Sequence, residues 1–107
     1  MIKYDDFAKI DFRVGKIVLV EDILGKDKIY KLEVDLGEFG KKTLFAGLKL
    51  NYKKEELQGH YVIIINNLEP KRMGNLESQG MLLAAEGEGV VTVLVPDKDI
   101  KLGSKVF

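Results

Sequence analysis

The chain has 107 residues, 17 basic and 17 acidic, and no cysteine. This length suits one domain with a modest core, so we assign residues 1–107 to a single domain. The lack of cysteine excludes disulfides, cysteine nucleophiles and zinc sites built on thiolates. No apolar run approaches the roughly 20 residues of a membrane-spanning helix, and the first residues lack the pattern of a signal peptide. We therefore expect a soluble, cytoplasmic domain with no membrane contact.

The charge is neutral overall but unevenly distributed. Residues 26–54 contain eight basic and four acidic side chains, whereas the segments before and after are weakly acidic. Local potential attracts a polyanion more effectively than total charge does. A solvated lysine surface is the alternative explanation, and charge alone favours that alternative.

The first half of the chain is expected to form mainly strands, with two short helical segments. Residues 4–10 can form a turn or two of helix, and residues 14–20 are apolar and β-branched. Residues 29–36 alternate strictly, with Tyr30, Leu32, Val34 and Leu36 on one face, which is typical of a half-buried strand. A turn at residues 37–40 precedes a return strand at 42–46. Residues 53–58 before Gly59 predict a short helix with a glycine stop.

The second half continues with short strands at residues 61–65, 81–85 and 90–95. Five or six strands, with one short helix between the third and fourth, predict an all-β, five-stranded OB-fold barrel with N- and C-terminal extensions. A different small β-barrel is the structural alternative.

Motifs for catalysis are missing. There is no Walker loop, and Gly87-Glu88-Gly89 lacks the third glycine and the helix of a dinucleotide site. His60, the only histidine, precedes a strand and has no nucleophile in its motif. Asp97 and Asp99 flank Lys98 in a turn, where Asp is favoured for backbone hydrogen bonding. We therefore expect no enzyme activity, no cofactor and no metal site.

Residues 66–85 form the most distinctive segment. It joins two strands and contains Lys71 and Arg72, which are suited to phosphate contacts. Ser78 offers a hydroxyl, and Met81 offers an adaptable apolar surface for a ribose or base. Long loops on a barrel often carry binding function. The segment is therefore the candidate binding site.

Several sequence blocks resemble a known family, the tRNA-binding domain found at the C-terminus of many methionyl-tRNA synthetases and in stand-alone relatives. The resemblance covers nearly the whole chain. Two positions depart from it: Gly74-Asn75 stand where the family usually has Arg-Gly, and Lys53-Lys54 where it tends to have Thr-Pro. The matching blocks are Asp11–Ile17, Lys26–Gly37, Gly47 with Tyr52–Gly59, Asn67–Pro70, Glu77–Ala84, Pro96–Lys98 and Gly103–Val106.

The resemblance implies an OB-fold homodimer that recognises the outer corner of tRNA by shape rather than sequence. It would assist an aminoacyl-tRNA synthetase, most directly the methionyl enzyme, as a C-terminal domain or a separate subunit. It assigns tRNA contacts to Lys28, Ser78 and Met81. To these we add Lys31, Lys71 and Arg72 from charge and position.

Two other functions compete with tRNA binding. A secretion chaperone shares the fold, so the chain could be a dimeric peptide-binding export chaperone. It could also be an assembly module that only dimerises a larger enzyme. For a dimer, we expect pairing of the C-terminal segments and of residues 4–10, because open strand edges need cover.

The aromatic residues argue against a general single-strand binder, which stacks bases on exposed rings. Tyr30, Phe45 and Tyr61 lie in or beside apolar runs, which favours a role in the core or in an interface. Phe39, in a turn, is the one clear candidate for an exposed ring.

Overall fold

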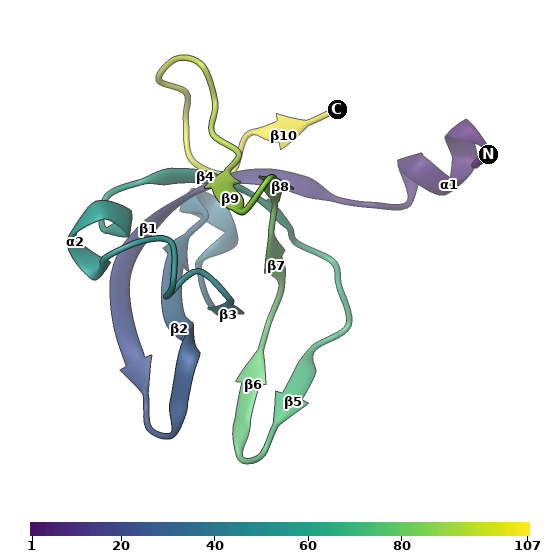
Figure 1. Ribbon diagram of the computed structural model, residues 1–107. Coiled ribbons are helices and arrows are strands. Elements are labelled where there is room, and N and C mark those ends of the chain that lie inside the picture. The colour runs from purple at the N-terminus through teal and green to yellow at the C-terminus, as the bar shows by residue number, and fades with distance from the viewer.

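The computed structural model describes all 107 residues, and it consists mostly of short antiparallel strands (Figure 1). Helix α1 spans Tyr4–Ala8, helix α2 spans Lys54–Leu57, and a 3-10 turn, η1, spans Gly37–Phe39. The strands are β1 Phe12–Ile23, β2 Lys26–Asp35, β3 Lys41–Ala46, β4 Tyr61–Ile65, β5 Lys71–Met73, β6 Leu76–Ser78, β7 Met81–Leu82, β8 Ala84–Gly87, β9 Val90–Val93 and β10 Lys105–Val106.

Five strands form the main sheet in the order β3-β2-β1-β4-β7, and β10 pairs with the start of β1. All of these pairs are antiparallel, and α2 lies in the chain between the third and fourth strands. This confirms the expected all-β OB-like architecture. The ladder does not continue from β7 back to β3, so the barrel is open along that seam. Strands β5–β6 and β8–β9 form two separate hairpins.

The core follows the alternation seen in the sequence. Tyr30, Leu32, Val34 and Leu36 are all buried, as expected for one face of β2 and its continuation. Leu57 of α2 is also fully buried and packs into the same cluster. The largest fully buried side chains are those of Ile17, Leu32, Leu36, Leu44, Leu57, Ile64, Val34 and Val62.

A glycine lets β1 lie close against β2. A Cβ atom on Gly15 would lie 2.5 Å from Cγ1 of Val34 and 2.8 Å from Cδ2 of Leu36, closer than packed carbons tolerate. A register irregularity follows between Ile17 and Leu19. Such irregularities bend and twist a strand, and β1 pairs with β4 through its first half and with β2 through its second.

The segment at residues 66–85 differs from the expected long loop. It contains the β5–β6 hairpin, in which Lys71 pairs with Ser78 and Met73 with Leu76. Two residues form its turn, and Gly74 has φ 65°, a conformation in which glycine is not strained. The strand expected at residues 81–85 is divided into β7, which belongs to the main sheet, and β8, which pairs with β9.

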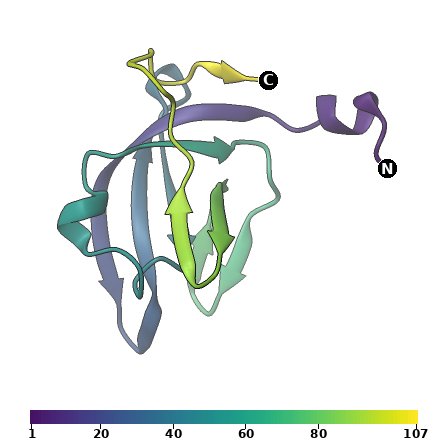
Figure 2. The same ribbon diagram turned by 45° about the horizontal axis from the view of Figure 1, so that its top comes forward.

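The N-terminal helix extends away from the barrel, and both chain ends lie on the same side of the molecule (Figures 1 and 2). No residue of α1 is buried. Its connection to the body is fixed by the Asn67 side chain, which accepts a hydrogen bond from the Asp11 N–H and donates one to the Lys9 carbonyl. The helix is therefore held at its base, with Tyr4 exposed and Phe7 half-buried against Phe12.

Candidate functional site

Phe45 lies at the centre of the candidate site. In β3, Leu44 and Ala46 point into the core, so the alternation of a strand directs Phe45 outward. Its ring is half-buried, and it lines three of the cavities on the molecule. Lys31 is its cross-strand neighbour on β2. Phe45 was expected in the core or in an interface, and the structure places it on the outer face beside Lys31, a predicted binding residue.

The lysines on and beside β2 differ in whether they are paired with acids. Asp22 forms ion pairs with both Lys49 and Lys54. Hydrogen bonds from Lys49 and Lys54 lower the pKa of the Asp22 carboxyl, and the same contact raises the pKa of Lys54. Lys31 lies 3.9 Å from Glu21. Lys28 is exposed and forms no ion pair, so its charge is available to a ligand.

Lys71 and Arg72 are adjacent in β5, so their side chains point to opposite faces of the hairpin, because neighbouring residues of a strand alternate. Arg72 is paired across the hairpin with Glu77 at 3.6 Å. Lys71 has no acidic partner and lines a cavity of about 190 Å³ together with Phe45, Gly47 and Ser78. The structure therefore brings Lys71, but not Arg72, to the side that faces Phe45.

Ser78 is buried, with 7% of its surface exposed. Its hydroxyl accepts a hydrogen bond from the Phe45 N–H at 3.1 Å and donates one to the Gly80 carbonyl at 3.1 Å. Both hydrogen-bonding functions of the side chain are thus used inside the protein. The hydroxyl expected to contact RNA instead occupies the open seam between β3 and β7.

Gln79 completes the seam. Its side-chain oxygen accepts a hydrogen bond from the Thr43 N–H at 2.9 Å, and its own N–H donates to the Thr43 carbonyl at 2.8 Å. Gly80 follows, where a Cβ atom would lie 2.9 Å from the Ile65 carbonyl oxygen. Ser78, Gln79 and Gly80 therefore cover the edge of β3 that the strand ladder leaves open. Ser78 and Gln79 do so through hydrogen bonds, and Gly80 does so through close packing.

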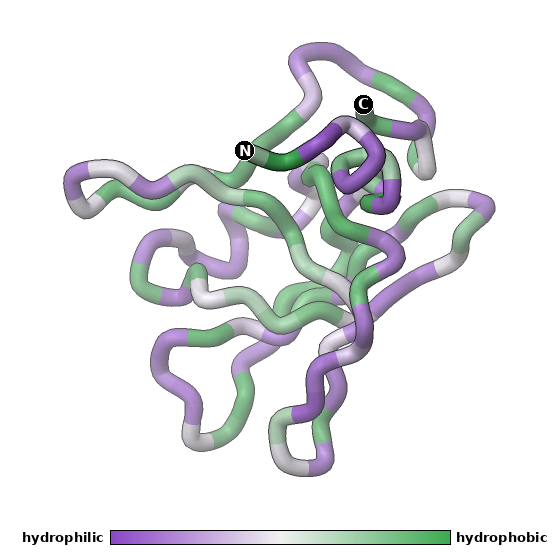
Figure 3. Tube along the Cα trace, turned by 90° about the vertical axis from the view of Figure 1, so that its right-hand side faces the viewer, coloured by the Kyte–Doolittle hydropathy of each residue, from purple (hydrophilic) through white to green (hydrophobic).

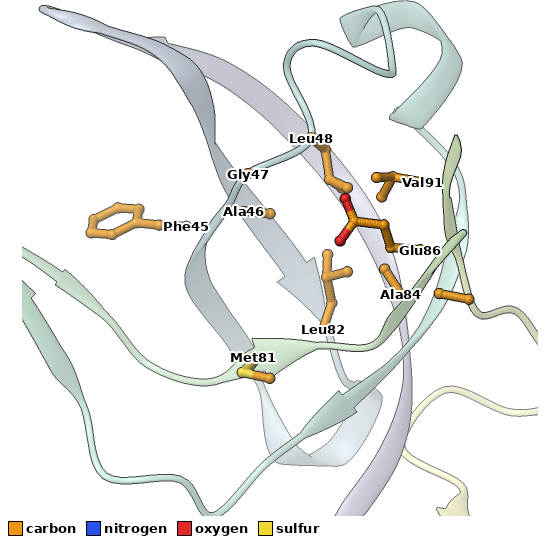
Figure 4. Close-up of a pocket in the computed structure, with 10 residues that line it drawn as sticks. Phe45, Ala46, Gly47, Leu48, Met81, Leu82, Ala84, Glu86 and Val91 are labelled. Atoms are coloured by element: carbon orange, nitrogen blue, oxygen red, sulfur yellow. The ribbon is translucent and has the colours of Figure 1, made fainter. Parts of the chain in front are cut away.

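Met81 stands at the rim of the cavity shown in Figure 4, which has a volume of about 430 Å³. Its side chain is 49% exposed. The cavity lies between the end of β3 and the β8–β9 hairpin, and eight of its ten lining residues are hydrophobic. Met81 is therefore placed where it can contact an apolar ligand face.

The structure thus gathers four of the six predicted residues around Phe45: Lys31, Lys71, Ser78 and Met81. Only the backbone of Lys28 is near this group, with its carbonyl 4.0 Å from the position of a Cβ on Gly47, and its side chain is on the phase of Tyr30 rather than that of Lys31. Arg72 points elsewhere. Phe39 is exposed as expected, but the Arg13 guanidinium covers its ring at 4.5 Å from the centroid.

Phe45 and Gln79 were not among the predicted site residues. The phase of Leu44 and Ala46 could have placed Phe45 on the outer face, because neighbouring strand residues alternate. No local signal identifies Gln79, whose partner Thr43 is 36 residues away.

Two broader features of the structure bear on function. None of its helices has the length and apolar character required to cross a membrane. No three side chains of His, Cys, Asp or Glu are grouped so that they could hold a metal ion.

Comparison with known proteins gives a consistent result. Residues 12–105 match the family model described as "Putative tRNA binding domain". The methionine–tRNA ligase of Pyrococcus horikoshii is 56% identical over 105 residues, which are 98% of this chain and 14% of that protein. The chain therefore spans about one seventh of the length of this relative.

Two solved structures share the whole fold. A MetRS-related protein from Pyrococcus horikoshii has a TM-score of 0.92 at 34% identity, covering 100% of this chain and 98% of that one. The CsaA chaperone of Picrophilus torridus has a TM-score of 0.92 at 38% identity, covering all of both chains. On the family match and these likenesses together, the chain belongs to the tRNA-binding domain family.

Proposed function

We propose that the chain binds folded tRNA by its shape and thereby assists an aminoacyl-tRNA synthetase, most directly the methionyl enzyme, without catalysing a reaction itself. Binding would raise the local concentration of tRNA near the catalytic domain. Because tRNA charging takes place in the cytoplasm, the proposal also places the chain there.

The main support is a pair of exposed lysines that lack acidic partners. Lys71 on β5 lies beside Phe45, Lys28 lies on β2, and the two residues are more than 40 positions apart in the chain. Cations from two elements can contact phosphates on a folded RNA surface, and A-form RNA is read largely through phosphates and 2′-hydroxyls. Phe45 and Met81 add apolar surface for a ribose or base.

Ser78 has a different role in this proposal. Its hydroxyl is fully used in the seam, so we infer that it supports RNA binding by holding β6 against β3. It is then a positioning residue for Lys71, with which it is paired across the hairpin.

A peptide-binding chaperone is the second candidate, favoured by the apolar cavity beside Met81 and by the fold shared with CsaA. The salt dependence of binding distinguishes the two functions. Counterion release makes RNA binding fall steeply as salt rises, whereas apolar peptide binding changes much less.

Replacing either free lysine should weaken tRNA binding through lost phosphate contacts. For Lys28→Ala and Lys71→Ala, we expect the slope of log K against log salt to fall in magnitude by about 1 each. A fluorescence titration over a range of salt concentrations measures this. Lys98→Ala is the matched control, since it removes the same charge in the loop after β9, at the opposite end of the molecule from the β5–β6 turn (Figure 1). Equal effects of all three changes would contradict the proposed surface.

Folded tRNA should outcompete an unstructured RNA of equal length, because the lysines and Phe45 are fixed on a rigid surface and no row of exposed aromatics is present for stacking. Competition binding at moderate salt checks this, with several tRNAs of different sequence expected to bind about equally. If unstructured RNA competes as well as tRNA does, recognition by shape is refuted.

We also propose a homodimer that covers the exposed apolar residues at the chain ends. Ile2 and Tyr4 are each 75% exposed and Phe107 is 96% exposed. The two ends lie on one side of the molecule, with hydrophobic segments in both (Figure 3). A neighbouring copy would bury these side chains against the same surface of its partner, as a two-fold interface requires.

Light scattering should therefore give twice the monomer mass at micromolar concentration. Tyr4→Asp, which places a charge in the proposed interface, should shift the equilibrium towards monomer, whereas Asp5→Asn on the same helix should not. A wild-type protein that is monomeric at this concentration rules the dimer out.

A further inference from the structure

We propose that the cavity beside Met81 holds one unpaired guanine base of the bound RNA, with the Glu86 carboxylate accepting hydrogen bonds from its Watson–Crick edge. This inference rests on the proposed tRNA binding and specifies one contact within it. It adds a base-reading element to a surface that otherwise recognises phosphates and shape.

The position of Glu86 is unusual for a charged residue. On the β8–β9 hairpin, Glu86 pairs with Val91, and Ala84 pairs with Val93. Val93 is buried and Val91 packs against the core, so this phase of β9 faces the barrel, whereas Ala84 and Glu86 on β8 line the cavity and remain exposed. Charged residues normally occupy the other, solvent-facing phase.

The carboxylate of Glu86 points into the cavity. Figure 4 shows it directed towards Leu48 and Leu82, across the space between β3 and β8. Glu86 forms no ion pair, and its side chain takes part in no hydrogen bond. Glu86 is exposed, so its carboxylate is solvated in the free protein. A ligand that fills the cavity must supply donors to it, because an unpaired carboxylate is costly to desolvate.

The chemistry of the cavity selects the part of an RNA that can enter. A phosphate is excluded, because the ionised carboxylate would repel it. A base can enter, since its faces are apolar enough to pack between the Leu48 and Met81 sides of the cavity. Single-stranded bases in RNA loops are read in this way, by apolar or aromatic contact to the face and hydrogen bonds to the edge.

Among the four bases, guanine fits the carboxylate best. An ionised carboxylate only accepts hydrogen bonds and can accept two in parallel. Guanine presents two adjacent donors, N1–H and the 2-amino group. Adenine and cytosine place a ring-nitrogen acceptor beside the amino group, and uracil flanks its single donor with two carbonyls. Each of these three would put an acceptor against the carboxylate.

A matched pair of substitutions tests this. Glu86→Gln and Glu88→Gln each remove one negative charge from the same hairpin, but Glu88 lies in the turn, away from the cavity lining. If the acids acted only through general repulsion, both changes would strengthen tRNA binding. We expect Glu88→Gln to leave binding unchanged or stronger and Glu86→Gln to weaken it about tenfold, within the range of a lost bidentate base contact.

Mononucleotides identify the base. Guanosine monophosphate at millimolar concentration should shift the Met81 methyl resonance in NMR spectra, and inosine monophosphate, which lacks the 2-amino group, should shift it less. Glu86→Gln should remove this difference. A stronger response to acetyl-arginine amide than to guanosine monophosphate would overturn the assignment in favour of a cationic peptide side chain.

The result separates this inference from the proposed function. If wild-type protein binds tRNA and Glu86→Gln binds it equally well or more tightly, the guanine site is wrong while tRNA binding stands. If wild-type protein does not bind tRNA, the proposed function itself fails.

Discussion

The side-chain seam between β3 and the segment after β6 is the constraint on which the rest of the binding surface depends. A sheet that stops at β3 leaves an edge with unpaired backbone groups, and such edges attract other chains. Here the Ser78 hydroxyl and the Gln79 amide accept hydrogen bonds from the Phe45 and Thr43 N–H groups. Two N–H groups of this edge are thereby satisfied without another strand.

The same bonds position the functional side chains. Ser78 ends β6, so its contact to β3 fixes the hairpin that carries Lys71. Phe45 supplies the N–H in that bond and directs its ring to the outer face beside Lys31. The chain direction after Gly80 then sets Met81 at the rim of the large cavity. Charge from two elements and apolar surface from two others converge because one short segment holds them together.

This arrangement explains how a chain with no net charge can bind a polyanion. The acidic side chains pair with only some of the basic ones. Asp22 forms ion pairs with Lys49 and Lys54, and Glu77 forms one with Arg72. Lys28 and Lys71 are left without acidic partners, and Lys71 lines a cavity together with Phe45. A ligand meets the local potential of this surface rather than the sum over the molecule.

Much of the fold followed from the sequence, because it depends on local patterns. The alternation from Tyr30 to Leu36 and the apolar run at residues 61–65 each define a strand without reference to the rest of the chain. The β5–β6 hairpin was also encoded locally, by Gly74-Asn75 between two short extended runs, but the residues between the strands expected at 61–65 and 81–85 were interpreted as a loop. Their proline, glycines and polar residues are equally typical of loops.

The candidate site was harder to predict, because its organisation depends on distant pairs. The resemblance placed Ser78 in the binding site, yet nothing near it in sequence indicates that its hydroxyl binds the Phe45 N–H, 33 residues away. Lys71 and Arg72 are adjacent and both are cationic. Only the alternation of side chains along β5 distinguishes Lys71, which has no acidic partner, from Arg72, which is paired with Glu77. Long-range register thus decided which of the expected residues face the ligand.

The most direct test of this account is a double-mutant cycle of Ser78→Ala and Lys71→Ala, with tRNA affinity measured across a range of salt. If Ser78 positions the hairpin, removing its uncharged hydroxyl should lower the magnitude of the salt slope by about 1, as Lys71→Ala does, and the double variant should bind much as Ser78→Ala alone. Faster hydrogen exchange of the Phe45 N–H in a protein that remains folded should accompany this loss. A Ser78→Ala variant with weaker binding, an unchanged salt slope and an effect that adds fully to that of Lys71→Ala would show direct contact with RNA and contradict the account.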